Sequence, residues 1–204
     1  MKALLVIDIQ NDFCPGGALA VPDGDEIIPV VNRLILSFDI VIQTQDWHPD
    51  NHSSFASSHE KRSSYDVIQM EYGDQVLWPD HCVQGSKGAE FHPDLITDKS
   101  EVIIRKGFRR HIDSYSTFYE NDQSTPTGLA GYLREREISE LFTVGLATDF
   151  CVKWSILDGM KENFKMILVE DAVRGIDLNG SLESAFIEMK EKGALFAKSE
   201  VLLK

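Results

Sequence analysis

KALLVIDIQ (residues 2–10) is an apolar run of strand length that is first interrupted by a charged residue at Asp8. A strand with one face in water would alternate apolar and polar residues, whereas a continuous apolar run is typical of a parallel strand buried on both faces. The stretch therefore predicts a central strand of a covered sheet, and it places the Asp8 carboxylate where that strand ends.

Runs of the same kind recur along the chain and predict further strands at 39–46, 101–106, 140–147, 165–171 and 194–198. Apolar residues spaced three and four apart predict helices at 27–38, 127–137, 151–163 and 180–193. We expect Asp25 to cap the first helix and Pro29 to lie in its first turn. The alternation of strands and helices indicates a three-layer, doubly wound α/β fold, with a mostly parallel sheet and helices on both faces.

Residues 46–100 depart from this alternation, because they are rich in His, Ser and Pro and only weakly periodic. Long irregular segments in a compact domain are usually functional or disordered. Aromatic residues throughout this segment argue for order: Trp47, Phe55, Tyr65, Trp78 and Phe91. We expect one domain over residues 1–204, with a long ordered loop region at about 46–100.

The composition is that of a soluble globular protein, with 43% hydrophobic and 26% charged residues and a formal net charge of −13. Nucleic acid and anionic membrane surfaces are disfavoured as partners, because both attract basic proteins. No stretch approaches the ~20 apolar residues of a membrane-spanning helix. Cys14, Cys82 and Cys151 form no C-x-x-C pair, and the N-terminal run is too short for a secretion signal, so we expect a cytoplasmic location.

Reactive side chains follow several of the predicted strands at the point where each ends. Ligands of open α/β sheets bind at the carboxyl ends of the strands, so these side chains should share one rim of the sheet. The set consists of Asp8, Asp46, His48, Lys106 and Cys151.

Cys151 follows the strand at 140–147 and begins a predicted helix, where the helix dipole should lower the pKa of its thiol. It is therefore a candidate nucleophile, with Asp8 as a general base and Lys106 holding the two together. The alternatives are a cysteine that only fills the core and a structural Asp8–Lys106 ion pair.

Asp46 and His48 are two positions apart, so their side chains point to the same side of an extended chain. A carboxylate and an imidazole are suitable ligands for zinc, iron or manganese. His81 is a candidate third ligand, and His52 or Glu60 could be a fourth. The alternative is a solvated polar turn, since the surrounding residues are turn formers.

The sequence resembles the nicotinamidases, also called pyrazinamidases, of the isochorismatase-like cysteine hydrolases. The resemblance runs over nearly the whole chain. It is carried by VIDIQNDFCPGGALAV (6–21), TQDWHPDNHSSFAS (44–57), LWPDHCVQGSKGAEFHPDL (77–95), KGFRRHIDSYSTFYEN (106–121), VGLATDFCVKWSILD (144–158) and EDAVRGID (170–177).

The resemblance implies an isochorismatase-like hydrolase fold and a role for each matching residue. The catalytic residues would be Asp8, Lys106 and Cys151. The metal ligands would be Asp46, His48 and His81, with His52 a ligand only in some members. The substrate ring would lie among Phe13, Trp78 and Tyr115. The oxyanion would be bound by N–H groups of Ala147 and Cys151, next to a cis peptide between Leu146 and Ala147.

The activity implied is hydrolysis of nicotinamide to nicotinate and ammonia through a Cys151 thioester, as in salvage of NAD, with pyrazinamide as a second substrate. The cofactor implied is a divalent metal, zinc first and iron or manganese as alternatives. Three other interpretations stay open: a related cysteine hydrolase of another small amide, a metal-hydroxide hydrolase in which Cys151 only packs, and a binding protein that keeps the fold. A homo-oligomer is compatible with the sequence.

Overall fold

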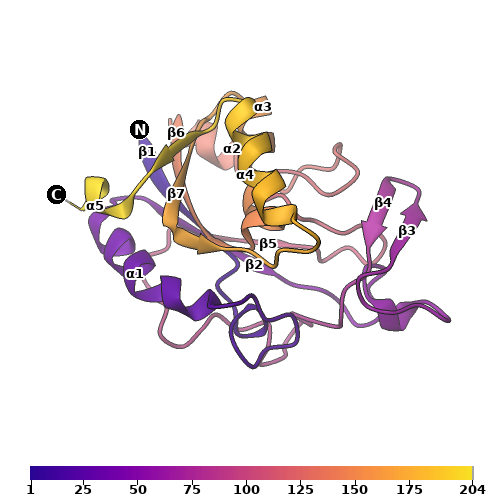
Figure 1. Cartoon of the computed structure of the whole chain (residues 1–204). Helices are drawn as coiled ribbons and strands as arrows, with labels where there is room; N and C mark the ends of the chain where they lie inside the picture. The colour runs from indigo at the N-terminus through magenta and orange to yellow at the C-terminus, as the bar shows by residue number, and fades with distance from the viewer. Residues whose placement is uncertain (204) are drawn as a thin grey trace.

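A parallel sheet of six strands forms the centre of the computed structural model, which describes residues 1–203 (Figure 1). Its strands run in the order β5-β2-β1-β6-β7-β8, and each neighbouring pair is parallel. The strands are β1 (Lys2–Ile7), β2 (Val41–Asp46), β5 (Val102–Lys106), β6 (Glu140–Leu146), β7 (Lys165–Arg174) and β8 (Leu195–Ala197). The chain builds outward from β1 on one side and then from β6 on the other, so the strand order reverses between β1 and β6.

Helices cover both faces of the sheet, as the alternation of elements predicts. They are α1 (Ile28–Ser37), α2 (Leu129–Glu135), α3 (Lys153–Lys161), α4 (Ser181–Glu191) and α5 (Ser199–Leu202). One apolar cluster joins α1 and α5 to one face, and a second joins α2, α3 and α4 to the other (Figure 1). The side chains of β1 alternate between the two, since Leu4 packs in the first cluster and Leu5 in the second. The predicted three-layer α/β fold is therefore confirmed.

The first helix begins differently from the prediction. Asp25 lies in a 3-10 turn, η2 (Gly24–Ile27), and the N-cap of α1 is Ile27, which makes no side-chain capping bond. The predicted Asp25 cap is therefore wrong, because the chain enters α1 through this tighter turn. Pro29 does lie in the first turn of α1, where its missing N–H leaves no helical bond unmade.

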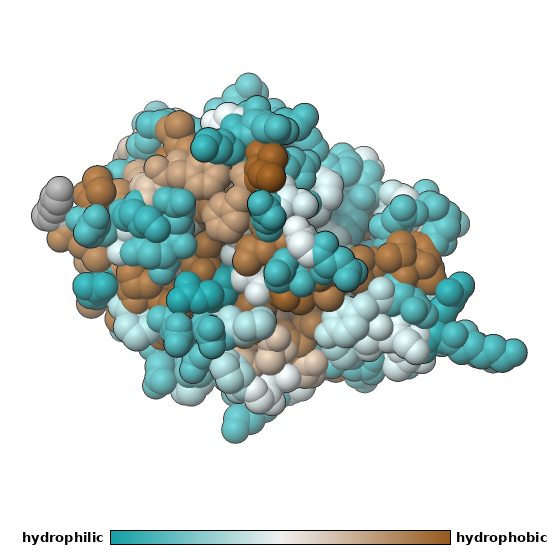
Figure 2. Space-filling model, viewed as in Figure 1, coloured by the Kyte–Doolittle hydropathy of each residue, from teal (hydrophilic) through white to brown (hydrophobic). Residues whose placement is uncertain are grey.

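The loop region contains an antiparallel hairpin that the sequence did not predict, β3 (Val67–Met70) and β4 (Gly73–Val76). It lies away from the central sheet (Figure 1). Its outward face carries exposed apolar side chains such as Val67, and Figure 2 shows hydrophobic surface over this part of the molecule. Gln75, in contrast, is fully buried. No helix within residues 1–203 is long and apolar enough to cross a membrane.

Gly145 in β6 lies directly against the backbone of β1. Its φ is +118°, and a Cβ atom added there would lie 2.0 Å from the Ile7 carbonyl oxygen and 2.7 Å from the Ile7 nitrogen. These atoms belong to the backbone of the neighbouring strand, so they cannot move aside without breaking the pairing of β1 with β6. Only glycine fits at this position.

We expect Gly145→Ala to lower the free energy of unfolding by at least about 3 kcal/mol, because backbone strain and overpacking act together. Urea unfolding followed by circular dichroism measures this loss. Gly131→Ala in α2 is the matched control, since a Cβ there meets no atom within 4 Å. That change should stabilise the protein by about 0.5–1 kcal/mol through helix propensity. Equal stability of the two variants would contradict the assigned strand contact.

Candidate active site

Lys106 is the centre of a buried charged cluster at the carboxyl ends of β1, β2 and β5. Its ammonium lies 2.8 Å from Asp8 Oδ2 and 3.4 Å from Cys151 Sγ, and it donates hydrogen bonds to Asp46 Oδ1 and to the Ser114 carbonyl oxygen. Asp46 and Lys106 are register partners in β2 and β5, which explains their contact. Residues distant in sequence thus meet on the predicted rim.

The charges of this cluster are set by burial and by one another. Burial acts to lower the pKa of Lys106, but Asp46 and Asp8 outweigh it and raise that pKa well above its usual range. Burial raises the pKa of Asp8, although the Lys106 ammonium opposes the shift. The Thr44 hydroxyl donates to Asp8 Oδ1 at 2.6 Å and fixes the orientation of the carboxylate. Lys106 is thus favoured in its charged form, and Asp8 accepts a proton more readily than an exposed aspartate does.

Cys151 lies in a single π-helical turn, η4 (Thr148–Val152), between β6 and α3. This turn runs directly into α3, so Cys151 does lie near a helix start, but the predicted lowering of its pKa is wrong. Burial raises the pKa of the thiol well above its usual range, with Lys106 acting in the opposite direction. A thiol with a raised pKa needs a base to take its proton before it can attack. Oxygen atoms of Asp8 and Asp46 lie within 4.8 Å of the Cys151 sulfur.

The peptide bond between Leu146 and Ala147, which leads from β6 into this turn, is cis. The family resemblance predicts this feature, and the structure confirms it. Ala147 is the N-cap of the turn that contains Cys151, and both residues line the same pocket.

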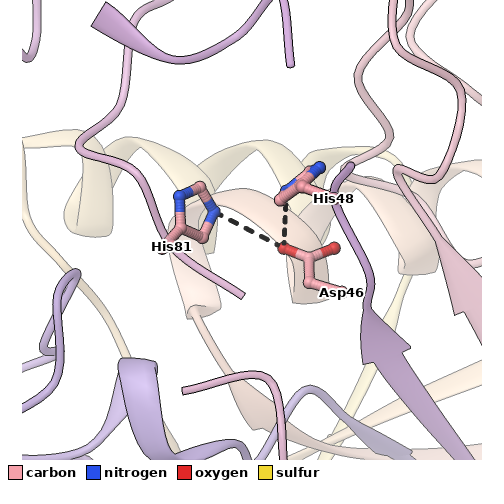
Figure 3. A group of neighbouring side chains, drawn as sticks. All are labelled: Asp46, His48 and His81. Atoms are coloured by element: carbon pink, nitrogen blue, oxygen red, sulfur yellow. Dashed lines mark ion pairs between the residues drawn. The ribbon is translucent and has the colours of Figure 1, made fainter. Parts of the chain in front are cut away.

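Asp46, His48 and His81 form a buried group whose potential ligand atoms all lie within 4.8 Å of one another. The Nε2 atoms of His48 and His81 lie 3.6 and 3.8 Å from Asp46 Oδ2, and Figure 3 shows all three side chains pointing toward a common centre. Two distant parts of the loop region pair with each other, because the His48 N–H donates to the Cys82 carbonyl at 3.0 Å. This pairing brings His81 beside His48.

The hydrogen bonds of the two histidines suit them to bind a metal. His48 Nδ1 lies 2.8 Å from the Gly107 carbonyl oxygen, and His81 Nδ1 lies 2.8 Å from that of Pro79. A carbonyl oxygen can only accept, so both Nδ1 atoms carry a proton, and each Nε2 atom faces Asp46 and can offer its lone pair to a metal ion once it is deprotonated. The side chains present therefore fit a divalent metal ion.

His52 and Glu60 were candidates for a fourth ligand. His52 falls in a neighbouring group with His48 and Asp113. Its Nδ1 atom lies 2.7 Å from Ser54 Oγ and its Nε2 atom 2.9 Å from the Arg109 carbonyl oxygen, so both ring nitrogens already contact the protein. Glu60 is exposed and, within residues 1–203, belongs to none of the groups that could hold a metal. The role of His52 as a fourth metal ligand stays a prediction, and nothing in the structure supports that role for Glu60.

A pocket of about 330 Å³, counted with its open mouth, leads down to Cys151. The aromatic residues predicted for the substrate ring line it, and so do the predicted Asp46, His81 and Ala147. These aromatic residues are Phe13, Trp78 and Tyr115.

Sequence reasoning missed Leu19, Asp113, Phe150 and Ile176, which also line this pocket. Two of them carried a usable signal: Phe150 directly precedes Cys151, and Ile176 follows the carboxyl end of β7, on the rim already identified. Leu19 and Asp113 lie in irregular segments, where no periodicity points to the pocket.

Comparison with known proteins gives a consistent result. An isochorismatase domain model matches residues 2–201. The chain is 52% identical to a nicotinamidase of Acinetobacter baylyi over 98% of this chain and 94% of that protein. A solved nicotinamidase/pyrazinamidase of Acinetobacter baumanii superposes with a TM-score of 0.98 at 55% identity, covering 99% of this chain and 98% of that one. A pyrazinamidase of Pyrococcus horikoshii, solved in complex with zinc, gives a TM-score of 0.79 at 38% identity, covering 97% and 98%.

We expect Lys106→Met to lower the free energy of unfolding of the metal-free protein at pH 7 by about 3–5 kcal/mol, because two buried carboxylates lose their counter-charge. Without the cation, burial holds the carboxyl pKa values above those of the unfolded chain. The folded state then binds more protons than the unfolded one, so the loss should shrink as the pH falls from 7 to 5.

Urea unfolding at both pH values measures this effect. Lys165→Met is the matched control, because Lys165 makes an exposed ion pair with Glu140. Exposed pairs contribute about 0–1 kcal/mol, so this variant should stay close to the wild type. A Lys106→Met protein as stable as the wild type at pH 7 would contradict the electrostatic account of the cluster.

Proposed function

The chain belongs to the isochorismatase family, and on that premise we propose that it hydrolyses nicotinamide to nicotinate and ammonia. The observation that carries the proposal is a buried thiol at the base of an aromatic pocket, within 4.8 Å of a carboxylate that can take its proton. Pyrazinamide differs from nicotinamide by one ring nitrogen in place of a C–H group, so we propose it as a second substrate.

Asp8 begins the reaction as a general base. Its carboxylate takes the proton of the Cys151 thiol, and the resulting thiolate attacks the amide carbon. Lys106 stays charged throughout and stabilises the negative charge while it passes from Asp8 to the sulfur. The oxyanion that forms accepts hydrogen bonds from the N–H groups of Ala147 and Cys151. A donor of this kind is typically worth about 3 kcal/mol in the transition state.

Protonated Asp8 then gives its proton to the amide nitrogen, the C–N bond breaks, and ammonia leaves. The acyl group is now held on Cys151 as a thioester. A water molecule enters the vacated space, and Asp8 removes one of its protons while the water oxygen attacks the thioester carbon. Nicotinate is released and Cys151 regains its proton, so the base and the nucleophile are both restored.

We propose that Asp46, His48 and His81 hold a divalent metal, with zinc first and iron or manganese as alternatives. The relative that was solved with zinc supports this choice, as does the Asp/His/His donor set. When bound there, a divalent ion supplies an electrophilic site for the lone pair of the pyridine nitrogen. Phe13, Trp78 and the three ligands then orient the ring so that its carboxamide faces Cys151.

We also propose that the protein works in the cytoplasm. Cys14, Cys82 and Cys151 are all free thiols, and a reducing compartment keeps thiols in that state.

Purified protein supplied with zinc should release ammonia from nicotinamide, and Cys151→Ala should lose at least about a thousandfold in kcat, because Cys151 carries the only thiol among the described residues that line the pocket. An ammonia assay coupled to glutamate dehydrogenase measures both. Cys82→Ala is the control, since Cys82 is buried but lies outside the pocket. Iodoacetamide should alkylate Cys151 less when nicotinamide is present.

Near-full turnover by Cys151→Ala would rule out the thioester mechanism and leave hydrolysis that does not use the thiol. No ammonia release by the wild-type protein from nicotinamide, with zinc, manganese or iron supplied in turn, would contradict the proposed function.

Zinc binding offers a test of the metal ligands that does not depend on turnover. Wild-type protein should bind about one zinc per chain, and His81→Ala should bind it at least ~100-fold more weakly, since even the partners of metal ligands contribute ~10–100-fold. Isothermal titration and metal analysis after dialysis measure this. His111→Ala is the control because His111 is exposed. Unchanged affinity in His81→Ala would remove His81 from the ligand set.

A further inference from the structure

Gln75 in β4 is a fully buried polar side chain that the mechanism does not use. It extends from the outlying hairpin to the back of the pocket wall, where its amide contacts Asp113 and Tyr115, both of which line the pocket. A buried amide is costly unless it is hydrogen-bonded, so its contacts show what it holds in place.

The orientation of the Gln75 amide follows from its partners. Its oxygen accepts hydrogen bonds from the Tyr72 hydroxyl at 3.1 Å and from Asn121 Nδ2 at 3.2 Å. An amide nitrogen could not accept either bond, so the oxygen faces Asn121 and the nitrogen faces the pocket wall. That nitrogen lies 3.0 Å from both Asp113 Oδ2 and the Tyr115 hydroxyl oxygen, and 2.7 Å from the Val76 carbonyl, so its two hydrogens are shared among three acceptors.

The Tyr115 hydroxyl has two hydrogen-bonding neighbours, and both are donors. One is Gln75 Nε2 at 3.0 Å, and the other is the Trp78 indole N–H at 3.2 Å. Neither nitrogen can accept a hydrogen bond. Within residues 1–203 the Tyr115 hydroxyl donates to no acceptor in the hydrogen bonds of the structure. Its hydrogen is therefore not committed to an acceptor in this part of the chain, and Tyr115 lines the pocket.

A flat ring amide bound for the proposed reaction already has partners for two of its acceptors. The carbonyl oxygen faces the N–H groups beside Cys151, and the ring nitrogen in the meta position faces the group formed by Asp46, His48 and His81. The Tyr115 donor is a further polar group on the same pocket wall. A pyridine amide has no third acceptor in its ring, whereas a diazine amide has a second ring nitrogen.

We propose that Tyr115 donates a hydrogen bond to the second ring nitrogen of diazine carboxamides, and that Gln75 is the positioning residue that directs this donor. This inference rests on the proposed amide hydrolysis. A buried donor left without an acceptor is costly, so the pair raises activity on a diazine amide relative to a pyridine amide. Gln75 acts only through the Tyr115 hydroxyl and does not touch the substrate.

The test is the ratio of kcat/KM for pyrazinamide to that for nicotinamide, measured for each variant in one ammonia assay. The enzyme concentration cancels from this ratio, so partial unfolding or loss of active sites does not change it. Tyr115→Phe should lower the ratio about tenfold, since it removes the hydroxyl and leaves the ring. Gln75→Leu, which cannot donate, should lower it about threefold, because Trp78 still contacts the hydroxyl.

Two further variants separate this role from general damage to the hairpin. The double variant Gln75→Leu/Tyr115→Phe should have the ratio of Tyr115→Phe alone, because Gln75 has nothing to direct once the hydroxyl is gone. Gln69→Leu is the matched control: it makes the same chemical change on the same hairpin at an exposed position, and it should keep the wild-type ratio.

The outcomes separate this inference from the proposed function. The wild-type protein could hydrolyse nicotinamide and yet show the same ratio, within twofold, as Tyr115→Phe and Gln75→Leu. That result would overturn the role of Tyr115 and Gln75 but not the proposed function. If the double variant lowered the ratio by the product of the two single-variant effects, the claim that Gln75 acts through Tyr115 would be overturned. Wild-type protein that hydrolyses neither amide would overturn the proposed function together with this inference.

Discussion

The buried Lys106 ammonium is the interaction on which the rest of the site depends. Two carboxylates and a thiol lie close together in one buried region of the protein. This region could not stay folded if both carboxylates were ionised and unpaired. One cation contacts Asp8, Asp46 and Cys151 together and offsets their repulsion. Its place at the end of β5, next to β2, follows from the strand order alone.

Asp46 links the acid–base chemistry to the metal group because its two oxygens face different partners. Oδ1 accepts from Lys106, while Oδ2 faces His48 and His81. Burial would raise the pKa of Asp46, but Lys106 and His48 outweigh burial and hold that pKa well below its usual range. Asp8 has the same cation but no histidines, and its pKa is raised. Neighbouring carboxylates thus differ in charge, which fits their proposed roles: Asp46 as an anionic metal ligand and Asp8 as a group that carries a proton.

The sheet and its rim were predictable from the sequence because they follow from local rules. Continuous apolar runs identified the strands, and the residue after each run identified Asp8, Lys106 and the Asp46–His48 pair, which the structure brings together. The rules failed where the chain is irregular. No periodicity marks the β3–β4 hairpin, since its strands have four residues each and only partly buried faces. The π-helical turn could not be predicted as separate from α3, because Cys151 and the residues of α3 share one helical pattern.

Substitutions on the rim of the sheet and in the loop region should have different effects. The rim holds the charges in the register of a parallel sheet, where a shift of one residue would turn every side chain to the other face. The loop region instead forms part of the pocket wall. Trp78, which follows the hairpin, lines the pocket, and Gln75 of the hairpin contacts the Tyr115 hydroxyl. Substitutions on the rim should therefore act on the chemical step. Substitutions in the hairpin and its contacts can change which ring is bound while Asp8, Lys106 and Cys151 keep their geometry.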